Sequence, residues 1–179
     1  MSQAIAEGDG ISVLVEVTDG QEAAAAEQQG ADALAVSHAA SDLRAGSQLP
    51  VLLLGELPST PGSTADAVVV PPDADAWERA QNLGIDCVVR VADADDLERA
   101  LEELDPEVFL LATESDSDDD ALESLLALLH DVPAGKLAIA ELRDASAEDV
   151  AELERAGVDA VLVTSRDVAM LVPAEPPEV

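Results

Sequence analysis

The chain has 179 residues, of which 39 are acidic and 8 are basic, so its formal net charge is −31. A charge of this sign and size repels nucleic acid and anionic membrane surfaces, and we expect neither as a partner. We interpret the acidic residues as part of a solvated surface. The alternative is that they form an acidic face on which a partner docks. The chain has one phenylalanine, Phe109, one tryptophan, Trp77, and no tyrosine. It therefore has few aromatic side chains on which a nucleotide or a sugar could stack.

The single cysteine and the first ten residues indicate in which cellular compartment the protein is expected. Cys87 has no second cysteine to pair with, and it lies in an apolar run where a buried, inert thiol is expected. The opening "MSQAIAEGDG" has neither the basic head nor the apolar segment of a signal peptide, and no apolar run reaches membrane-spanning length. These features predict a cytoplasmic protein.

Eight short apolar runs follow one another along the chain. Each has the length of a strand and is almost continuously apolar, as strands buried on both faces are. The runs are "ISVLVEV" (11–17), "ADALAVS" (31–37), "PVLLLGE" (50–56), "ADAVVVP" (65–71), "IDCVVRV" (85–91), "EVFLLAT" (107–113), "KLAIAE" (136–141) and "DAVLVTS" (159–165).

Helical patterns separate most of these runs, for example at 93–104, 116–129 and 146–157. The last has Ser146 as the expected N-cap, Asp149 three residues later, and Gly157 where a left-handed C-cap favours glycine. By contrast, "GELPSTPGST" (55–64) contains two prolines and two glycines, so the third helix should be missing or reduced to a turn.

A repeated motif supports a repeated strand-helix unit. "GADALAV", "GIDCVVRV" and "GVDAVLV" share one pattern, and "TADAVVV" is a variant of it. Eight such units favour a closed (β/α)₈ TIM barrel over an open doubly wound sheet, although such barrels typically have about 250 residues. We expect an N-terminal segment (1–10), one barrel domain (11–172) and a C-terminal tail (173–179).

In a barrel, the chemistry lies at the carboxyl ends of the strands. Cationic side chains there could hold a phosphate or a carboxylate. Alternatively, Glu16, Arg90 and Glu141 neutralise one another inside the barrel, and breaking such a buried cluster at Arg90 would cost about 3 to 5 kcal/mol. The charged and polar residues predicted at these ends are Glu16, Ser37, His38, Arg90, Glu141, Arg143, Ser165 and Arg166.

Two further features of the sequence, His38 and an acidic run, could suggest a metal site, but neither predicts one. His38 is interpreted as a hydrogen-bonded side chain, with a base or ligand as the alternative. The run "ESDSDDD" (114–120) lacks the glycine and the closing glutamate of a calcium loop, and acidic residues are ordinary at a helix N-terminus. We therefore expect no metal and no other cofactor.

From about residue 65 to 170 the chain resembles the indole-3-glycerol-phosphate synthase family, (β/α)₈ enzymes that close a ring with decarboxylation in tryptophan biosynthesis. The last two units of the family read approximately "AESGIxTxEDVxxLxxAGVDAFLVGES", and "AELRDASAEDVAELERAGVDAVLVTSR" matches them without a gap. The fifth strand of the family, "LDVLVEVHDExELERAL", is matched by "IDCVVRVADADDLERAL". The first, third and fourth strands match more weakly.

The departures from the family affect its chemistry. The catalytic lysine of the family falls at Leu54 and its fifth-strand glutamate at Arg90, so neither the proton donor nor the base is present. Glu16 and Glu141 are retained by position and are the catalytic candidates that the resemblance implies.

The phosphate-binding positions of the family also differ. Its serine-glycine pair after the seventh strand falls at Leu142 and Arg143, and its glycine and serine after the eighth fall at Thr164 and Arg166. A backbone cradle for phosphate would therefore lack its glycines.

Three functions stay open at this point. The first is a non-catalytic minimal barrel. The second is a protein that binds a phosphorylated small molecule through Arg90, Arg143, Ser165 and Arg166. The third is an active carboxy-lyase of the synthase type. The oligomeric state does not follow from the sequence.

Overall fold

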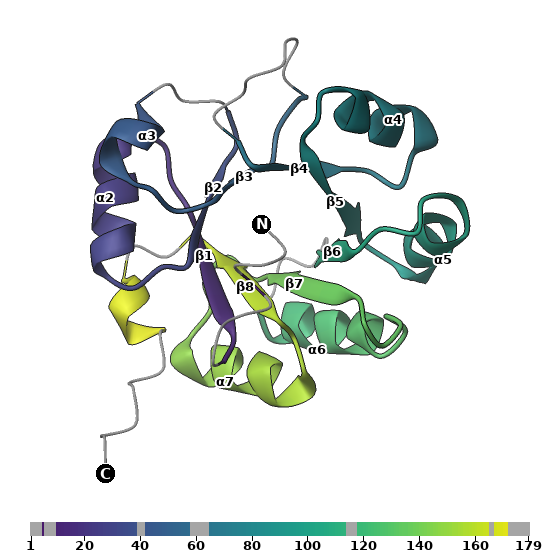
Figure 1. Cartoon of the computed structure of the whole chain (residues 1–179). Coiled ribbons are helices and arrows are strands. Elements are labelled where there is room, and N and C mark those ends of the chain that lie inside the picture. Colours follow the sequence, from purple (N-terminus) through teal and green to yellow (C-terminus); the bar gives the residue numbers. More distant parts are fainter. Residues whose placement is uncertain are drawn as a thin grey trace.

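The computed structural model contains eight parallel strands that close into a barrel in the order of the sequence (Figure 1). It describes residue 5 and residues 10–38, 42–57, 65–113, 118–164 and 167–171, with only the backbone of 118 and 119. The closed barrel confirms the (β/α)₈ prediction and excludes the open sheet. Its strands are β1 (Ser12–Glu16), β2 (Ala33–Val36), β3 (Val51–Leu53), β4 (Ala67–Val70), β5 (Asp86–Val91), β6 (Val108–Leu111), β7 (Leu137–Glu141) and β8 (Ala160–Val163).

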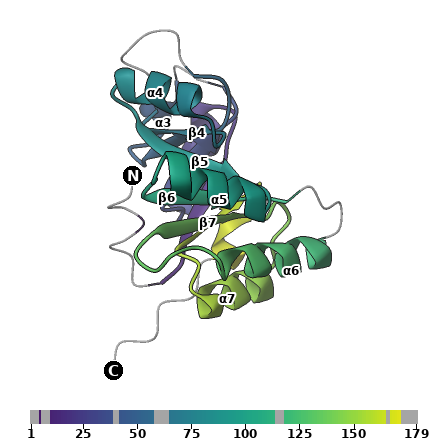
Figure 2. The ribbon, with the colours of Figure 1, turned by 90° about the vertical axis from the view of Figure 1, so that its right-hand side faces the viewer.

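Helices surround the strands on the outside of the barrel, as Figures 1 and 2 show. None of the described helices is long and apolar enough to cross a membrane. The helices are α2 (Gly20–Gln28), α3 (Leu43–Gly46), α4 (Ala74–Asn82), α5 (Ala94–Glu103), α6 (Asp118–Leu129), α7 (Ala147–Ala156) and the 3₁₀ helix η1 (Val168–Met170).

The short chain length is explained by reduced helices. Between β3 and β4 no helix is found in the described residues 54–57 and 65–66, in agreement with the predicted missing third helix, while 58–64 lie outside the described residues. The sequence did not predict that α3, between β2 and β3, has only four residues. After β8 the described chain forms the three-residue η1, beside α2 in Figure 1.

The caps of α7 are those that the sequence predicted. The Ser146 hydroxyl accepts a hydrogen bond from the Asp149 backbone N–H, and the Asp149 carboxylate accepts one from the Ser146 backbone N–H. Gly157 ends the helix in the left-handed conformation, with φ at 93° and ψ at 25°. Only glycine adopts this conformation without strain, so the strand-helix-strand unit of β7, α7 and β8 is defined by local sequence.

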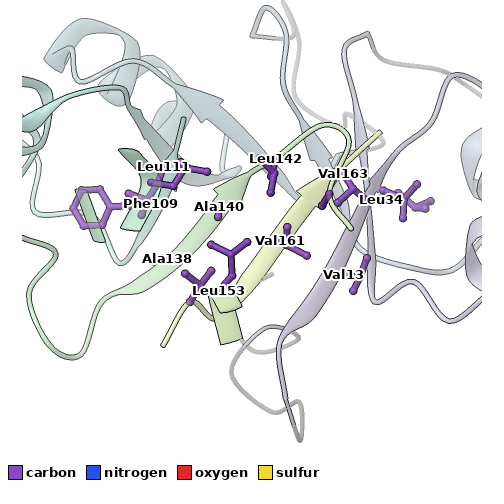
Figure 3. Packing of buried hydrophobic residues seen from close by; sticks show 14 of the residues in the cluster. Val13, Leu34, Phe109, Leu111, Ala138, Ala140, Leu142, Leu153, Val161 and Val163 are labelled. Atoms are coloured by element: carbon purple, nitrogen blue, oxygen red, sulfur yellow. The ribbon is translucent and has the colours of Figure 1, made fainter. Parts of the chain in front are cut away.

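Side chains alternate along each strand between two apolar clusters. The interior cluster fills the barrel and includes Leu14, Leu52, Leu110 and Ile139, with Ile5 of the N-terminal segment buried among them. The outer cluster lies between strands and helices, and Figure 3 shows part of it, where Leu153 of α7 lies beside the outward side chains of β7 and β8.

The aspartate of the repeated motif has a structural role at the amino ends of the strands. In the motifs of Asp32, Asp66 and Asp159 the carboxylate accepts a hydrogen bond from a backbone N–H of the preceding strand. These bonds, which we call the aspartate clamps, join Asp32 to Val13, Asp66 to Val51 and Asp159 to Ala138, each at 2.8 Å. The backbone N–H of each aspartate also donates to the carbonyl of the same partner residue, at 2.9 or 3.0 Å. Each clamp therefore fastens a strand to the next strand along the chain.

Helix α3 packs closely against α2 at Gly46. A Cβ atom added to Gly46 would lie 2.0 Å from the carbonyl oxygen of Gly20. No side chain fits in that space, so glycine at position 46 lets α3 pack directly against α2.

Candidate functional site at the mouth of the barrel

The carboxyl ends of the strands form the mouth of the barrel, where the sequence predicted the charged groups. Below this level the interior is closed by apolar side chains such as Leu14, Leu110, Ile139 and Leu162. Leu54, directly after β3, is half-buried and packs against the same interior cluster. The position that aligns with the family's lysine therefore faces the barrel interior and holds an apolar group.

Three charged residues gather at one side of the mouth. Nη2 of Arg90, on β5, lies 3.2 Å from Oε2 of Glu141, on β7. Nε of Arg143 lies 3.8 Å from Oε1 of the same glutamate. The side chain of Glu141 is 16% exposed, whereas those of Arg90 and Arg143 are 48% and 74% exposed. We call these residues the mouth triad: one shielded carboxylate held between two guanidinium groups that face water.

The contact of Arg90 with Glu141 agrees with the predicted alternation along β5, because Val88, two residues earlier, belongs to the interior cluster. The expected inclusion of Glu16 is not seen among the described contacts. Its carboxylate instead accepts a hydrogen bond of 2.5 Å from the hydroxyl of Ser37. β1 neighbours β2 and β8, so Glu16 and Ser37 are adjacent, while β5 lies across the barrel.

Three predicted site residues remain: His38, Ser165 and Arg166. The side chain of His38 is exposed after β2. Ser165 and Arg166 lie outside the described residues, as do 114–117 of the acidic run. Among the residues that the structure describes, no group of three or more histidine, cysteine, aspartate or glutamate side chains is arranged to hold a metal ion.

Thr164 is a contributor to the mouth that the sequence alone did not reveal. Its backbone N–H and its hydroxyl both donate to the carbonyl oxygen of Arg143, at 3.0 and 2.8 Å. These bonds fasten the loop after β7 to the end of β8. The resemblance placed Thr164 at a phosphate-binding glycine, and its side chain here is used to position a loop.

Acidic caps surround the mouth, because each helix that follows a strand begins there. Asp19, Asp73 and Asp93 accept hydrogen bonds from the first backbone N–H groups of α2, α4 and α5. At α7, Ser146 and Asp149 cap each other. A phosphate is normally attracted to a helix N-terminus by free N–H groups and the helix dipole. At these four helices a carboxylate of the chain already lies there.

A cavity of about 540 Å³ adjoins the mouth between β1, α2 and η1. Its walls include Glu16, Asp19 and Glu22 together with the apolar Val15 and Val168. Neither this cavity nor a second one at the other end of the barrel is lined by a member of the mouth triad. The two arginines, with side chains about half and three quarters exposed, face water at the mouth.

Cys87 differs in part from its prediction. It is half-buried rather than buried, and its Sγ lies 3.7 Å from the carbonyl oxygen of Ile85. Burial, and then the negative charge of Asp86, raise the pKa of the thiol. A raised pKa leaves the group protonated and unreactive at neutral pH, as the sequence interpretation expected.

Comparisons with known proteins support the fold and part of the sequence resemblance. No protein-family model matches the chain. An indole-3-glycerol phosphate synthase from Variovorax paradoxus (strain S110) is 38% identical over 84 residues, which is 47% of this chain and 32% of that protein. The chain thus matches about a third of the length of this curated relative. The resemblance is confirmed over that region.

Two solved structures share the fold. The N-acetylmannosamine-6-phosphate 2-epimerase from Clostridium perfringens has a TM-score of 0.67 and 15% identity, and the comparison covers 92% of this chain and 88% of that one. A structure described as "Native KDPGal structure" has a TM-score of 0.64 and 16% identity, and the comparison covers 90% and 91%. At these identities the likeness concerns the (β/α)₈ architecture alone.

Proposed function

We propose that this chain is a minimal (β/α)₈ barrel that does not catalyse the indole-forming ring closure. The observation that carries the proposal is the apolar environment of Leu54. Ring closure onto a ketone needs a proton donor at the carbonyl and a base afterwards. Leucine supplies no proton, and the guanidinium of Arg90, always charged, supplies no base.

The mouth triad is then mainly structural. Glu141 is the most shielded charge of the three, and both arginines compensate its charge. Without them a shielded carboxylate would be left next to apolar side chains, which is costly. The acidic caps around the mouth add a field that opposes entry of a phosphate.

An activity assay tests this proposal. The purified chain, given the carboxyphenylamino deoxyribulose phosphate of the synthase reaction, should form no indole product above a blank without protein. Product formation that disappears in Glu141→Gln would overturn the proposal, because the retained glutamate would then be catalytic without its expected partners.

A second candidate function is binding of a phosphorylated small molecule at the arginines. The exposure of the two guanidinium groups favours it, because each has donors facing water that Glu141 does not occupy. The attraction of the phosphate to these guanidinium groups has to exceed its repulsion by the acidic caps around the mouth. Titration calorimetry with inorganic phosphate and with N-acetylmannosamine 6-phosphate tests this candidate. Heat that saturates in the wild type and is abolished in Arg90→Leu supports binding, and heats equal to dilution exclude it for these compounds.

A further inference from the structure

Among the described residues, Ile5 is the one buried member of the interior cluster that does not belong to a strand. Its side chain is 4% exposed, and the other buried members of the cluster come from the strands of the barrel. Ile5 precedes Ser12, the first residue of β1, by seven positions. An isoleucine of the N-terminal segment is therefore packed in the core of the barrel itself.

Small residues make room for this side chain at the amino ends of the strands. Four strands begin with a small, buried residue: Ser12 of β1, Ala33 of β2, Ala67 of β4 and Ala160 of β8. The three alanines belong to the interior cluster, and Ser12 lies two residues before Leu14, which does so too. The interior of a (β/α)₈ barrel is normally filled by bulky branched side chains. The four small residues leave space where the chain enters β1, and Ile5 is the side chain at hand to fill it.

The wall around this space is rigid. The strands are hydrogen-bonded into a closed ring, and neighbouring strands stay about 4.8 Å apart. The aspartate clamps add bonds at the same ends, between β1 and β2, β3 and β4, and β7 and β8. A wall of this kind cannot move inward when a side chain is lost, so an empty space remains. An empty apolar space stays dry and takes up small apolar molecules.

We propose that the amino end of the barrel interior is a pocket for a small apolar molecule and that Ile5 occupies it as an internal ligand. We call it the Ile5 pocket, with Ser12, Ala33, Ala67 and Ala160 as its walls. Its ligand class is a hydrocarbon no larger than the isoleucine side chain. A charged group is disfavoured there, because it would lose its water among alanine side chains. The pocket does not depend on the absence of ring closure, since it lies at the end of the strands opposite the mouth.

Ile5→Ala and xenon test the proposal in the full chain. The variant removes an ethyl and a methyl group from the pocket and should open a space that a xenon atom fits. In xenon NMR the variant should shift the xenon signal along a saturating curve, with an affinity at least about fivefold above that of the wild type. Xenon under pressure should also raise the melting temperature of the variant and not that of the wild type. Equal affinities of the two chains would overturn the proposal, and so would equal melting temperatures without xenon.

Ile11→Ala is the matched control, because it removes the same groups from a similarly buried side chain of the outer cluster, which is 6% exposed. That cluster lies between strands and helices, and a helix can move toward the sheet to close the space. The control should also melt at a lower temperature than the wild type, but it should gain no xenon affinity. Equal gains in Ile5→Ala and Ile11→Ala would mean that xenon enters any core defect, and would refute the Ile5 pocket.

Refilling the space from its wall keeps the proposal testable if Ile5→Ala does not fold. Ala67→Val alone should lower the melting temperature, because its added methyl groups compete with Ile5 for the same space. Combined with Ile5→Ala, the same substitution should raise the melting temperature or restore folding, since the methyl groups then fill an empty space. An effect of the same sign in both backgrounds would show that Ile5 and Ala67 share no pocket, and would refute the proposal. Circular dichroism measures the melting temperatures and the folded state.

Discussion

Removing the side chain of Asp159 should destabilise the barrel by about 2 kcal/mol. One oxygen of its carboxylate accepts the hydrogen bond from Ala138 at 2.8 Å, and Ala138 is 1% exposed. In Asp159→Ala this buried N–H is left without its partner, and a hydrogen bond to a charged group contributes about 1.5 to 3 kcal/mol. Asp159→Asn keeps an oxygen acceptor and removes the charge, so it should cost about 1 kcal/mol.

Urea unfolding followed by circular dichroism measures these differences in the free energy of unfolding. Glu107→Ala is the control, because Glu107 holds the same place before β6 and its exposed side chain forms no aspartate clamp in the described chain. The control should stay within about 0.5 kcal/mol of the wild type. Equal stabilities of Asp159→Ala and Glu107→Ala would refute the reasoning, since the clamp bond would then contribute nothing.

Three further predictions concern charge. Arg90→Leu should lower the free energy of unfolding by less than about 1 kcal/mol, because Arg90 is half open to water and Arg143 still compensates Glu141; a loss above 3 kcal/mol by urea unfolding would restore the buried-cluster interpretation. Sodium chloride should raise the melting temperature of the chain, since salt at 0.1 M screens carboxylate repulsion beyond about 10 Å; a flat or falling curve would contradict this. Because the pKa of the Cys87 thiol is raised in the folded chain, the thiol of the unfolded chain loses its proton at a lower pH than that of the folded chain. Its contribution to stability should therefore be lost as pH rises above the ordinary thiol pKa of 9.0, and a Cys87→Ala variant with an identical alkaline profile would disprove it.

Local patterns in the sequence were sufficient for most of the fold. Apolar runs of strand length and the repeated motif predicted the eight parallel strands, and Ser146 with Gly157 predicted both ends of α7. These features depend on residues close together in the chain. The one-turn α3 was not predicted, and its packing against α2 depends on the close approach of Gly20 and Gly46, which belong to different helices.

The candidate site was predictable only in part. Alternation along a strand placed Arg90 on the interior side, and the contact with Glu141 agrees with it. Alternation does not tell which strands face each other across the barrel, so Glu16 was expected near Arg90 and is bonded to Ser37 instead. The motif aspartates were recognised as a repeat, but their bonds depend on which residues of neighbouring strands lie side by side, and the repeat does not give this register.

The position of the aspartate clamps separates the parts of the barrel that hold it together from the parts that can change. All three clamps lie at the amino ends of the strands, and the groups at the carboxyl ends take no part in them. A substitution at the mouth, such as a leucine or an arginine in place of a reactive group, therefore leaves these fastenings intact. Such a scaffold tolerates exchange of the residues at its mouth over evolutionary time, which fits a chain that resembles a synthase over part of its length and has Leu54 and Arg90 at its mouth.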